Sequence, residues 1–324
     1  MNQNNISLGK KLSKALTPIF GHSPSFISDS NLVVEQLKSM NCLAFEFKEI
    51  ESFPPKLRKN VVMVAMDNTT IPAYTKLHTL FRNSRVLMIP LLSFDPSIDA
   101  TLYALELIAQ SNFESATERN KIWLERLMEP EKPLLLRGNG CDLTCEIEEG
   151  VYVMRPKTEV LLFPGEWDSI GSYFEVGMVP PPDSFRPAFV INGTLSVPGV
   201  AIAHHRQMTD SLLILPSQAW SLFENLRKDN GFPLKLEIVN SQIVQILAGR
   251  VDVLASLAKL TNEERELILT EMAFSTNISI TSENIDWTKN SQMNEGLVGI
   301  HLAVGDGLTG AHVDFICPGV DLTV

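Results

Sequence analysis

The C-terminal stretch His301-Leu-Ala-Val-Gly-Asp-Gly-Leu-Thr-Gly-Ala-His-Val-Asp-Phe315 carries the clearest structural signal in this 324-residue chain. Polar and apolar residues alternate over 301–304 and again over 311–315, which is the pattern of β-strands. The six residues between these segments include three glycines and suit a hairpin loop. If Val304 pairs with Ala311, then Ala303 faces His312, and His301 faces Asp314 on the same side. Imidazoles and carboxylates bind divalent metals, so the hairpin is a candidate metal site.

The region upstream of residue 133 alternates helical and strand patterns. Segments 60–66 and 85–90 are apolar runs of the kind buried on both faces of a parallel sheet. Segment 42–47 also reads as a strand. Helical spacing is present over 30–40, 71–81, 99–110 and 118–128. The pattern predicts an α/β domain over residues 1–132 with an open, mostly parallel sheet. It contains no glycine-rich phosphate loop, so a nucleotide site has no support.

Residues 133–324 have a different texture, in which short strands dominate. Turn signals such as Asn192-Gly193 separate them, and one helix is predicted over 251–260. We therefore expect a second, β-rich α+β domain that carries the metal-type site. The predicted strands cover 134–137, 143–147, 160–163, 188–191, 212–215, 234–239, 243–247 and 271–275.

Composition narrows the classes of partner. Hydrophobic residues make up 44% of the chain and the formal net charge is −11. The negative charge argues against nucleic acid or an anionic membrane as a partner, since both attract basic surfaces. No stretch reaches 18 apolar residues. The four cysteines are scattered, and we expect Cys141 and Cys145 to be buried thiols in a reducing, cytoplasmic setting.

Three upstream carboxylates are candidates for the same chemistry. Glu271 has mostly apolar neighbours on a predicted strand, so it lies either at an exposed edge or buried beside a cation. Glu166 follows a Pro-Gly turn at a predicted strand end, where a side chain can be aimed into a cleft. Glu175 also lies among apolar residues and competes with Glu166 for that role. Either glutamate is a candidate metal ligand or general base.

The C-terminal half resembles the thermophilic-type metallo-aminopeptidases, the aminopeptidase T and S family, and their shorter 2,5-dihydroxypyridine dioxygenase relatives. The resemblance covers roughly residues 134–321 and consists of short blocks in the same order. The blocks are Gly138-Asn-Gly-Cys-Asp142-Leu-Thr ("GTDLT"), Phe163-Pro-Gly-Glu166 ("LPxGE"), Asn192-Gly193-Thr194 ("NGT"), the hairpin from Pro233 ("PIxLxxExGxV"), Glu271 with Thr276-Asn277 ("ExxxGTN"), Glu295 to Gly305 ("ExxxGTxHxAxG") and His312-Val-Asp314 ("HxD").

This resemblance implies a set of metal ligands. In the peptidases the corresponding residues bind two divalent ions, such as zinc, cobalt or manganese. Carried over block by block, the ligands are Glu166, Glu271, His301, His312 and Asp314. The chain departs from the peptidases in one respect, because the loop after His301 lacks their catalytic tyrosine. It departs from the dioxygenases in another, because Glu271 stands near the position of one of their histidines.

Three functions follow as alternatives. The first is a metal-dependent hydrolase of peptide-like amides, similar to an aminopeptidase. The second is a mononuclear non-haem iron(II) oxygenase that uses the two histidines and one carboxylate. The third is a catalytically silent relative that binds a peptide or small molecule in a biosynthetic pathway. Members of the resembled family are commonly dimers or larger, so we also expect a homo-oligomer.

Overall fold

The N-terminal half forms a parallel sheet covered by helices on both faces. The structure is a computed structural model that describes residues 3–52, 54–67, 74–129, 133–182 and 184–323. The sheet has the order β2-β1-β3-β4-β8, and each adjacent pair is parallel. Its strands are β1 (Ser25–Ser28), β2 (Ala44–Glu46), β3 (Asn60–Val64), β4 (Arg85–Ile89) and β8 (Trp167–Ser169).

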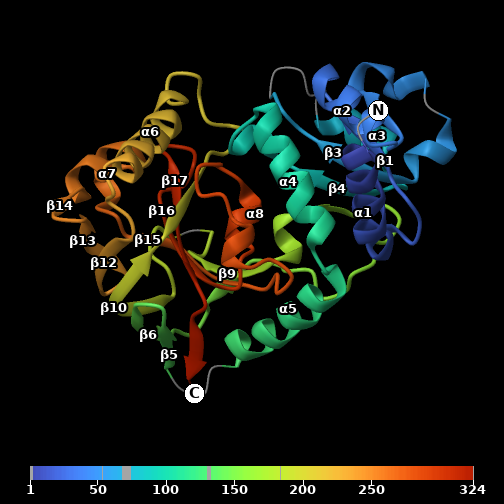
Figure 1. The fold of residues 1–324 in the computed structure, drawn as a ribbon. Helices are drawn as coiled ribbons and strands as arrows, with labels where there is room; N and C mark the ends of the chain where they lie inside the picture. The colour runs from blue at the N-terminus through green and yellow to red at the C-terminus, as the bar shows by residue number, and fades with distance from the viewer. Residues whose placement is uncertain (1–2, 53, 68–73, 130–132, 183, 324) are drawn as a thin grey trace.

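Two apolar clusters hold the helices to this sheet. Residues of α1 (Gln3–Phe20), α2 (Asn31–Ser39), α4 (Ile98–Gln110) and α5 (Phe113–Met128) pack on one face. Helix α3 (Tyr74–Leu80) contributes Leu77 to the cluster on the other face. Near-continuous apolar strands are therefore buried on both sides, as the runs over 60–66 and 85–90 predict. Figure 1 shows this part in blue and teal.

The C-terminal half contains two antiparallel sheets packed face to face. The seven-stranded sheet has the order β14-β13-β12-β10-β6-β5-β18, and the six-stranded sheet has the order β11-β17-β16-β15-β9-β7. Their bounds are β5 (Leu134–Gly138), β6 (Cys141–Ile147), β7 (Tyr152–Val153), β9 (Glu175–Val179), β10 (Phe189–Val197), β11 (Gly199–Ala203), β12 (Leu234–Val239), β13 (Gln242–Ala248), β14 (Val251–Asp252), β15 (Leu269–Ser275), β16 (Gly299–Val304), β17 (His312–Pro318) and β18 (Asp321–Thr323).

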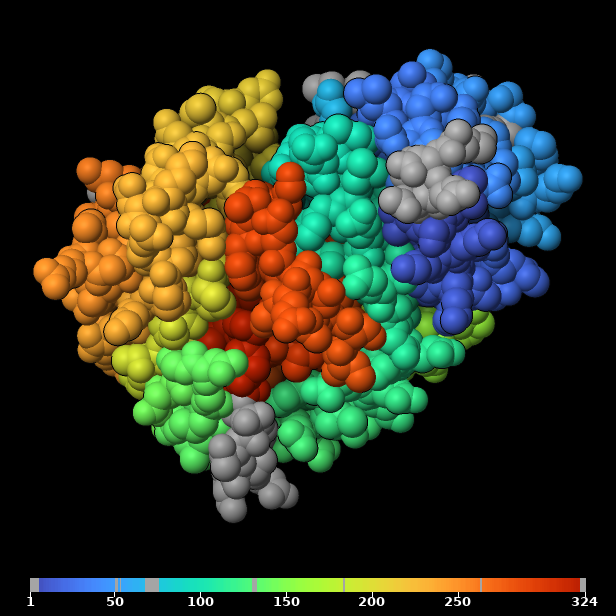
Figure 2. All heavy atoms as spheres, in the orientation of Figure 1, coloured from blue at the N-terminus to red at the C-terminus, as the bar shows by residue number. Residues whose placement is uncertain are grey.

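The largest apolar cluster lies between these two sheets. The six-stranded sheet supplies alternate residues to it, including Met272, Leu302 and Val313. Helices α6 (Ile214–Lys228) and α7 (Leu254–Thr261) add Phe223 and Leu257. Because side chains alternate across a strand, the remaining residues of β9, β15, β16 and β17 point to the opposite face. Helix α8 (Gln292–Glu295) lies over that face, against α4 (Figure 2).

Most predicted elements are present, and two predicted strands are wrong. Segment 212–215 leads into helix α6, where Pro216 is tolerated because it lies in the first turn. Segment 160–163 forms no strand; its Leu162 N–H donates to the Ile19 carbonyl instead. Strand β8 comes from beyond residue 133 yet completes the parallel sheet. The division into domains at 132/133 stays a prediction.

Candidate metal centre

One face of the six-stranded sheet gathers the ionisable residues. Glu271 of β15, His301 of β16, and His312 and Asp314 of β17 all lie on the face that points away from the large apolar cluster. Glu175 of β9 pairs with Ser275 and lies on that same face. The alternation of polar and apolar residues predicts this convergence for His301, His312 and Asp314. It leaves Glu271 either at an exposed edge or buried, and it predicts no strand at Glu175.

The register of the C-terminal hairpin differs from the expected one by two residues. Val304 pairs with Val313, and Ala303 pairs with Asp314. The loop is longer because the Asp306 carboxylate accepts hydrogen bonds from the backbone N–H groups of Leu308 and Thr309, which orders a wider turn. A shift of two residues preserves the face of each side chain, so the metal-type residues still converge.

The cluster contains two groups of three ligand-type residues that share Glu271. One group is Glu175, Glu271 and His301, and the other is Glu271, His312 and Asp314. Glu271 Oε1 lies 3.5 Å from His301 Nε2, whereas its Oε2 lies 3.6 Å from His312 Nε2. His301 Nε2 lies 3.7 Å from Glu175 Oε2, and His312 Nε2 lies 3.2 Å from Asp314 Oδ1. The two oxygens of one carboxylate thus face two different imidazoles.

Small residues leave room for these side chains. A Cβ atom at Gly177 would lie 2.8 Å from Glu271 Oε1 and 2.5 Å from the Met154 methyl group. Ala273 pairs with both Gly177 and His301. Ala303, on the same face as His301, pairs with Asp314. Any larger side chain at Gly177 would displace the shared carboxylate. The face is therefore shaped around Glu271.

Both imidazoles are oriented from behind. His312 Nδ1 lies 2.9 Å from the Gly305 carbonyl oxygen, to which it donates when protonated there. His301 Nδ1 lies 3.3 Å from Ser275 Oγ. Each ring therefore turns Nε2 toward the carboxylates. A partner on the outer nitrogen is the usual arrangement for metal-binding histidines, because it fixes the ring and its tautomer.

The electrostatics are those of crowded, buried charges. Burial opposes the charged form of His301, but the neighbouring carboxylates outweigh it and raise its pKa to about 9. The same balance raises the pKa of His312 to about 10. Burial raises the pKa of Glu175 to about 8, with His301 acting in the opposite direction. Burial also disfavours ionised Asp314, yet His312 and a hydrogen bond to Glu295 keep its pKa below the usual value.

Glu295 is a member of this cluster that the sequence reasoning did not single out. It is 5% exposed, shares a hydrogen bond with Asp314, and its Oε1 has no hydrogen-bond partner among the described residues. Burial and the nearby Asp314 raise its pKa well above the usual value. The signal was available, because Glu295 opens the block that ends in the His301 segment.

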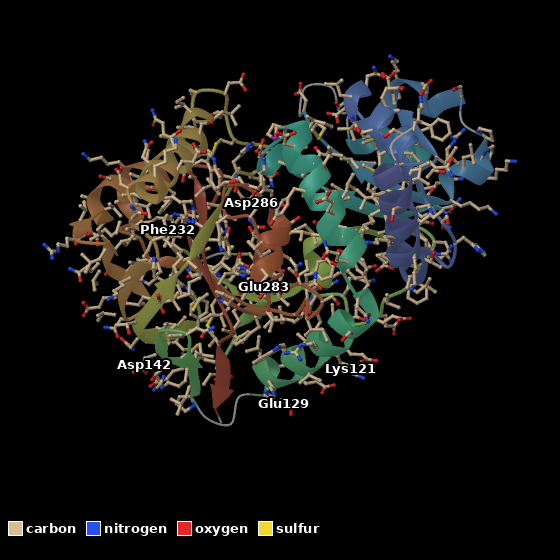
Figure 3. All side chains as sticks on the ribbon, in the orientation of Figure 1. Lys121, Glu129, Asp142, Phe232, Glu283 and Asp286 are labelled. Atoms are coloured by element: carbon tan, nitrogen blue, oxygen red, sulfur yellow. The ribbon has the colours of Figure 1, made fainter. Side chains whose placement is uncertain are left out.

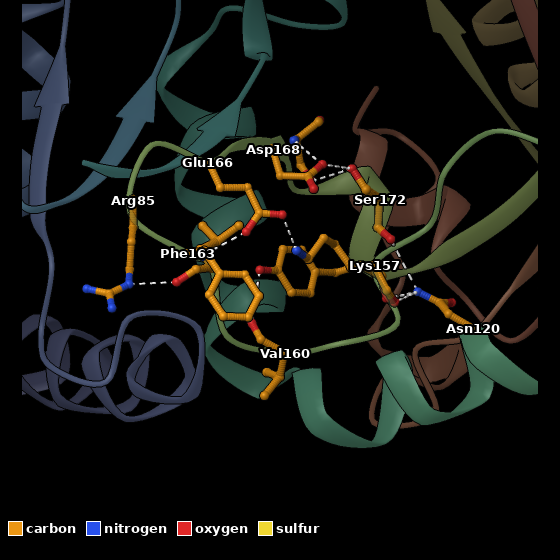
Figure 4. Close-up of polar contacts among 11 residues, drawn as sticks. Arg85, Asn120, Lys157, Val160, Phe163, Glu166, Asp168 and Ser172 are labelled. Atoms are coloured by element: carbon orange, nitrogen blue, oxygen red, sulfur yellow. Dashed lines mark hydrogen bonds and ion pairs between the residues drawn. The ribbon is translucent and has the colours of Figure 1, made fainter. Parts of the chain in front are cut away.

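Glu166 does not join either group of ligands. Its Oε1 lies 2.5 Å from Lys157 Nζ, and its Oε2 accepts the Phe163 N–H at 2.7 Å (Figure 4). Both oxygens are thus occupied beside the edge strand of the parallel sheet. The first block of the resemblance is equally remote, since Asp142 lies at the periphery and pairs with Arg137 (Figure 3). Of the two competing glutamates, the structure brings Glu175 into the cluster.

The donor set fits divalent cations. The two groups contain three carboxylates, and ionised they bring three negative charges into a site whose histidines are 1% and 21% exposed. Isolated buried charge is costly unless it is paired or bound to a metal. With neutral imidazoles, one divalent ion leaves a charge of −1 and two leave +1. Oxygen and imidazole donors suit zinc, manganese or cobalt.

Comparison with known proteins now identifies the family. A model of the crocagin biosynthetic protein CgnE/B family matches residues 21–324. The chain belongs to this family. The match spans the parallel sheet, both antiparallel sheets and every residue of the cluster. Curated proteins give no match to the chain.

Solved structures with a similar fold also exist. AmpT from Thermus thermophilus aligns with a TM-score of 0.50 at 13% identity, over 99% of this chain and 94% of that chain. The 2,5-dihydroxypyridine dioxygenase from Pseudomonas putida KT2440 aligns with a TM-score of 0.47 at 13% identity, over 98% and 94%. The AmpT likeness shows that this CgnE/B family member shares its fold.

In the part of the chain that the structure describes, no helix has the length and apolar character needed to cross a membrane.

A cavity of about 730 Å³ lies where β3 and β4 end, and helix α6 forms its opposite wall with Trp220. This cavity is lined by His204 and Asn290, not by the residues of the cluster.

Proposed function

We propose that this protein is a metal-dependent hydrolase of a peptide-like amide that uses two divalent cations. The observation that carries the proposal is the position of Glu271, whose two oxygens face two different histidines and which belongs to both ligand groups. A carboxylate that bridges two ions about 3.5–4 Å apart is typical of two-metal hydrolytic sites. Glu175 and His301 would complete the ligands of one ion, and His312 and Asp314 would complete those of the other.

Bound divalent ions would polarise a scissile carbonyl and activate a water molecule. The chain's own residues supply the remaining requirements. The outer contacts of His301 and His312 hold both rings in place. Burial favours the protonated form of Glu295, and its hydrogen bond with Asp314 orients that carboxylate. With two divalent ions bound, the three ligand carboxylates and the ions together would carry a charge of +1, which would favour the negative charge that develops on an amide oxygen during attack.

The iron oxygenase is less well supported. A facial triad needs two histidines and one carboxylate around one ion. Among the described residues, neither group combines His301 with His312, and the cluster contains four carboxylates. A relative that has lost turnover is the remaining alternative. It would share the fold and keep ligand affinity without needing a complete donor set.

The test is metal content together with amide hydrolysis. We expect the purified protein to bind about two divalent ions per chain and to release an amino acid from aminoacyl amides. His312→Ala should lower the metal content and abolish the release. Arg250→Ala, at the exposed turn between β13 and β14 of the seven-stranded sheet, is the control. Equal metal content in the parent and His312→Ala would remove the proposed site.

A further inference from the structure

A second cavity opens directly onto the proposed metal centre. Its volume is about 250 Å³, and Glu175 and Gly177 form part of its wall. Gly177 lies against Glu271, so the cavity reaches the Glu175–Glu271–His301 group. Gly171 is also in the wall, and a Cβ there would lie 2.9 Å from Glu175 Oε1. Two glycines thus keep the approach to this group open.

Among the residues that the structure describes in the wall of this cavity, one has a positively charged side chain. Arg155 lines it and forms no hydrogen bond or ion pair with any residue that the structure describes. Its neighbour Lys157 is different, because its Nζ is engaged by Glu166. Arg155 and Glu175 are the charged residues of this wall, and Glu175 is a proposed metal ligand. If a cation holds Glu175, no other acidic residue described in this wall would pair with the guanidinium.

The backbone around Arg155 is fixed. The Met154 N–H donates to the Gly177 carbonyl at 2.8 Å, and the Lys157 N–H donates to the Ser172 carbonyl at 2.7 Å. Buried Asn120 then joins these segments, because its side-chain amide donates to the carbonyls of Lys157 and Ser172 (Figure 4). Arg155 therefore extends from a hydrogen-bonded stretch of backbone, which holds the base of its exposed side chain in place.

Gln292 lines another wall of the cavity. Its Nε2 would lie 2.5 Å from a Cβ built at Gly171, whereas its Oε1 is enclosed by the protein and has no hydrogen-bond partner among the described residues. The cavity thus presents a guanidinium, a side-chain amide and a proposed metal ligand around a small volume. These groups suit a ligand that has both a carboxylate and a scissile carbonyl.

We propose that Arg155 binds a free carboxylate on the substrate, and that the substrate is a small amide such as a dipeptide. This inference rests on the proposed function. The cavity is smaller than the about 300–1,000 Å³ typical of sites for drug-sized ligands, so it suits a group of one or two amino-acid residues. A guanidinium recognises a carboxylate by two parallel hydrogen bonds, which a neutral amide cannot accept equally well.

The test compares leucyl-leucine with leucyl-leucinamide, which differ only in the terminal carboxylate. We expect KM to be at least about tenfold lower for leucyl-leucine, as for a charge-assisted hydrogen bond. Arg155→Ala should remove this difference by raising KM for leucyl-leucine, with kcat and metal content unchanged. Arg155→Lys should retain part of it, and Arg250→Ala all of it. Equal KM values in the parent, or an undiminished preference in Arg155→Ala, would overturn the inference.

The same pair separates this inference from the proposed function. If the metal-loaded protein cleaves neither compound, the proposed hydrolase function is wrong. Calorimetry then measures the affinities for leucyl-leucine and leucyl-leucinamide without turnover. Tighter binding of leucyl-leucine that depends on Arg155 would support carboxylate recognition even in that case. Indistinguishable binding of the two compounds would reject it.

Discussion

Replacing Glu271 by glutamine should affect both cations at once. The change keeps the shape of the side chain and removes one charge. It leaves Glu175 with His301 in one group and His312 with Asp314 in the other. Glu175→Gln removes a ligand from one group alone. The two variants make the same chemical change on the same sheet face, so they isolate the effect of sharing.

The expected magnitude follows from linkage. Loss of an outer partner of a metal ligand costs about 10–100-fold in affinity, so we take about 100-fold per ion as the minimum for a ligand itself. At a metal concentration of about 100 times Kd, two ions stabilise the parent by about 5.4 kcal/mol. A 100-fold weaker Kd at both positions leaves about 0.8 kcal/mol, and at one position about 3.1 kcal/mol. For a chain of this length, the metal-induced Tm shift is then about 8 °C for the parent, about 1 °C for Glu271→Gln and about 5 °C for Glu175→Gln.

Thermal unfolding with zinc or manganese and with chelator measures these shifts, and elemental analysis gives the number of ions. Glu237→Gln, on the exposed face of β12, is the matched control and should behave as the parent does. The reasoning is refuted if Glu271→Gln retains one ion at full affinity and shifts Tm as Glu175→Gln does. Glu271 would then serve one position and bridge nothing.

Two further predictions concern stability, and the first is for the metal-free protein. The free energy of unfolding of the metal-free protein should fall as pH rises from about 6.5 through 9–10. The raised pKa values of His301 and His312 contribute stability below the unfolded pKa, and this stability is lost as the two rings deprotonate. Urea unfolding with chelator at pH 6 and pH 9 measures the difference, and equal or greater stability at pH 9 contradicts the prediction. Asn120→Ala should cost about 3 kcal/mol, or about 4 °C in Tm, because three backbone carbonyls and the Thr276 hydroxyl lose their buried partner. Calorimetry measures this change, with Asn83→Ala at the exposed turn between α3 and β4 as the control. An unchanged Tm of Asn120→Ala contradicts the prediction.

Local sequence pattern was sufficient for several features. The apolar runs predicted β3 and β4, and period-two alternation placed His301, His312 and Asp314 on one face of paired strands. That parity survived a two-residue error in register, because a shift by an even number of residues preserves the face. The sequence also predicted the strand over 271–275, which the structure contains as part of β15. The resemblance to the metallo-aminopeptidases added Glu271 to the three hairpin residues as a candidate ligand.

Only the tertiary structure decided which upstream acid joins the site. Glu166 and Glu175 both stand in suggestive local contexts, but Lys157 engages Glu166, whereas β9 pairs with β15 and brings Glu175 beside Glu271. Glu295 enters through α8, which packs over the face from elsewhere in the fold. Local periodicity determines the direction of a side chain, since it depends on backbone geometry. Strand order and long-range packing determine its neighbours, since they depend on burying the apolar faces of the whole chain.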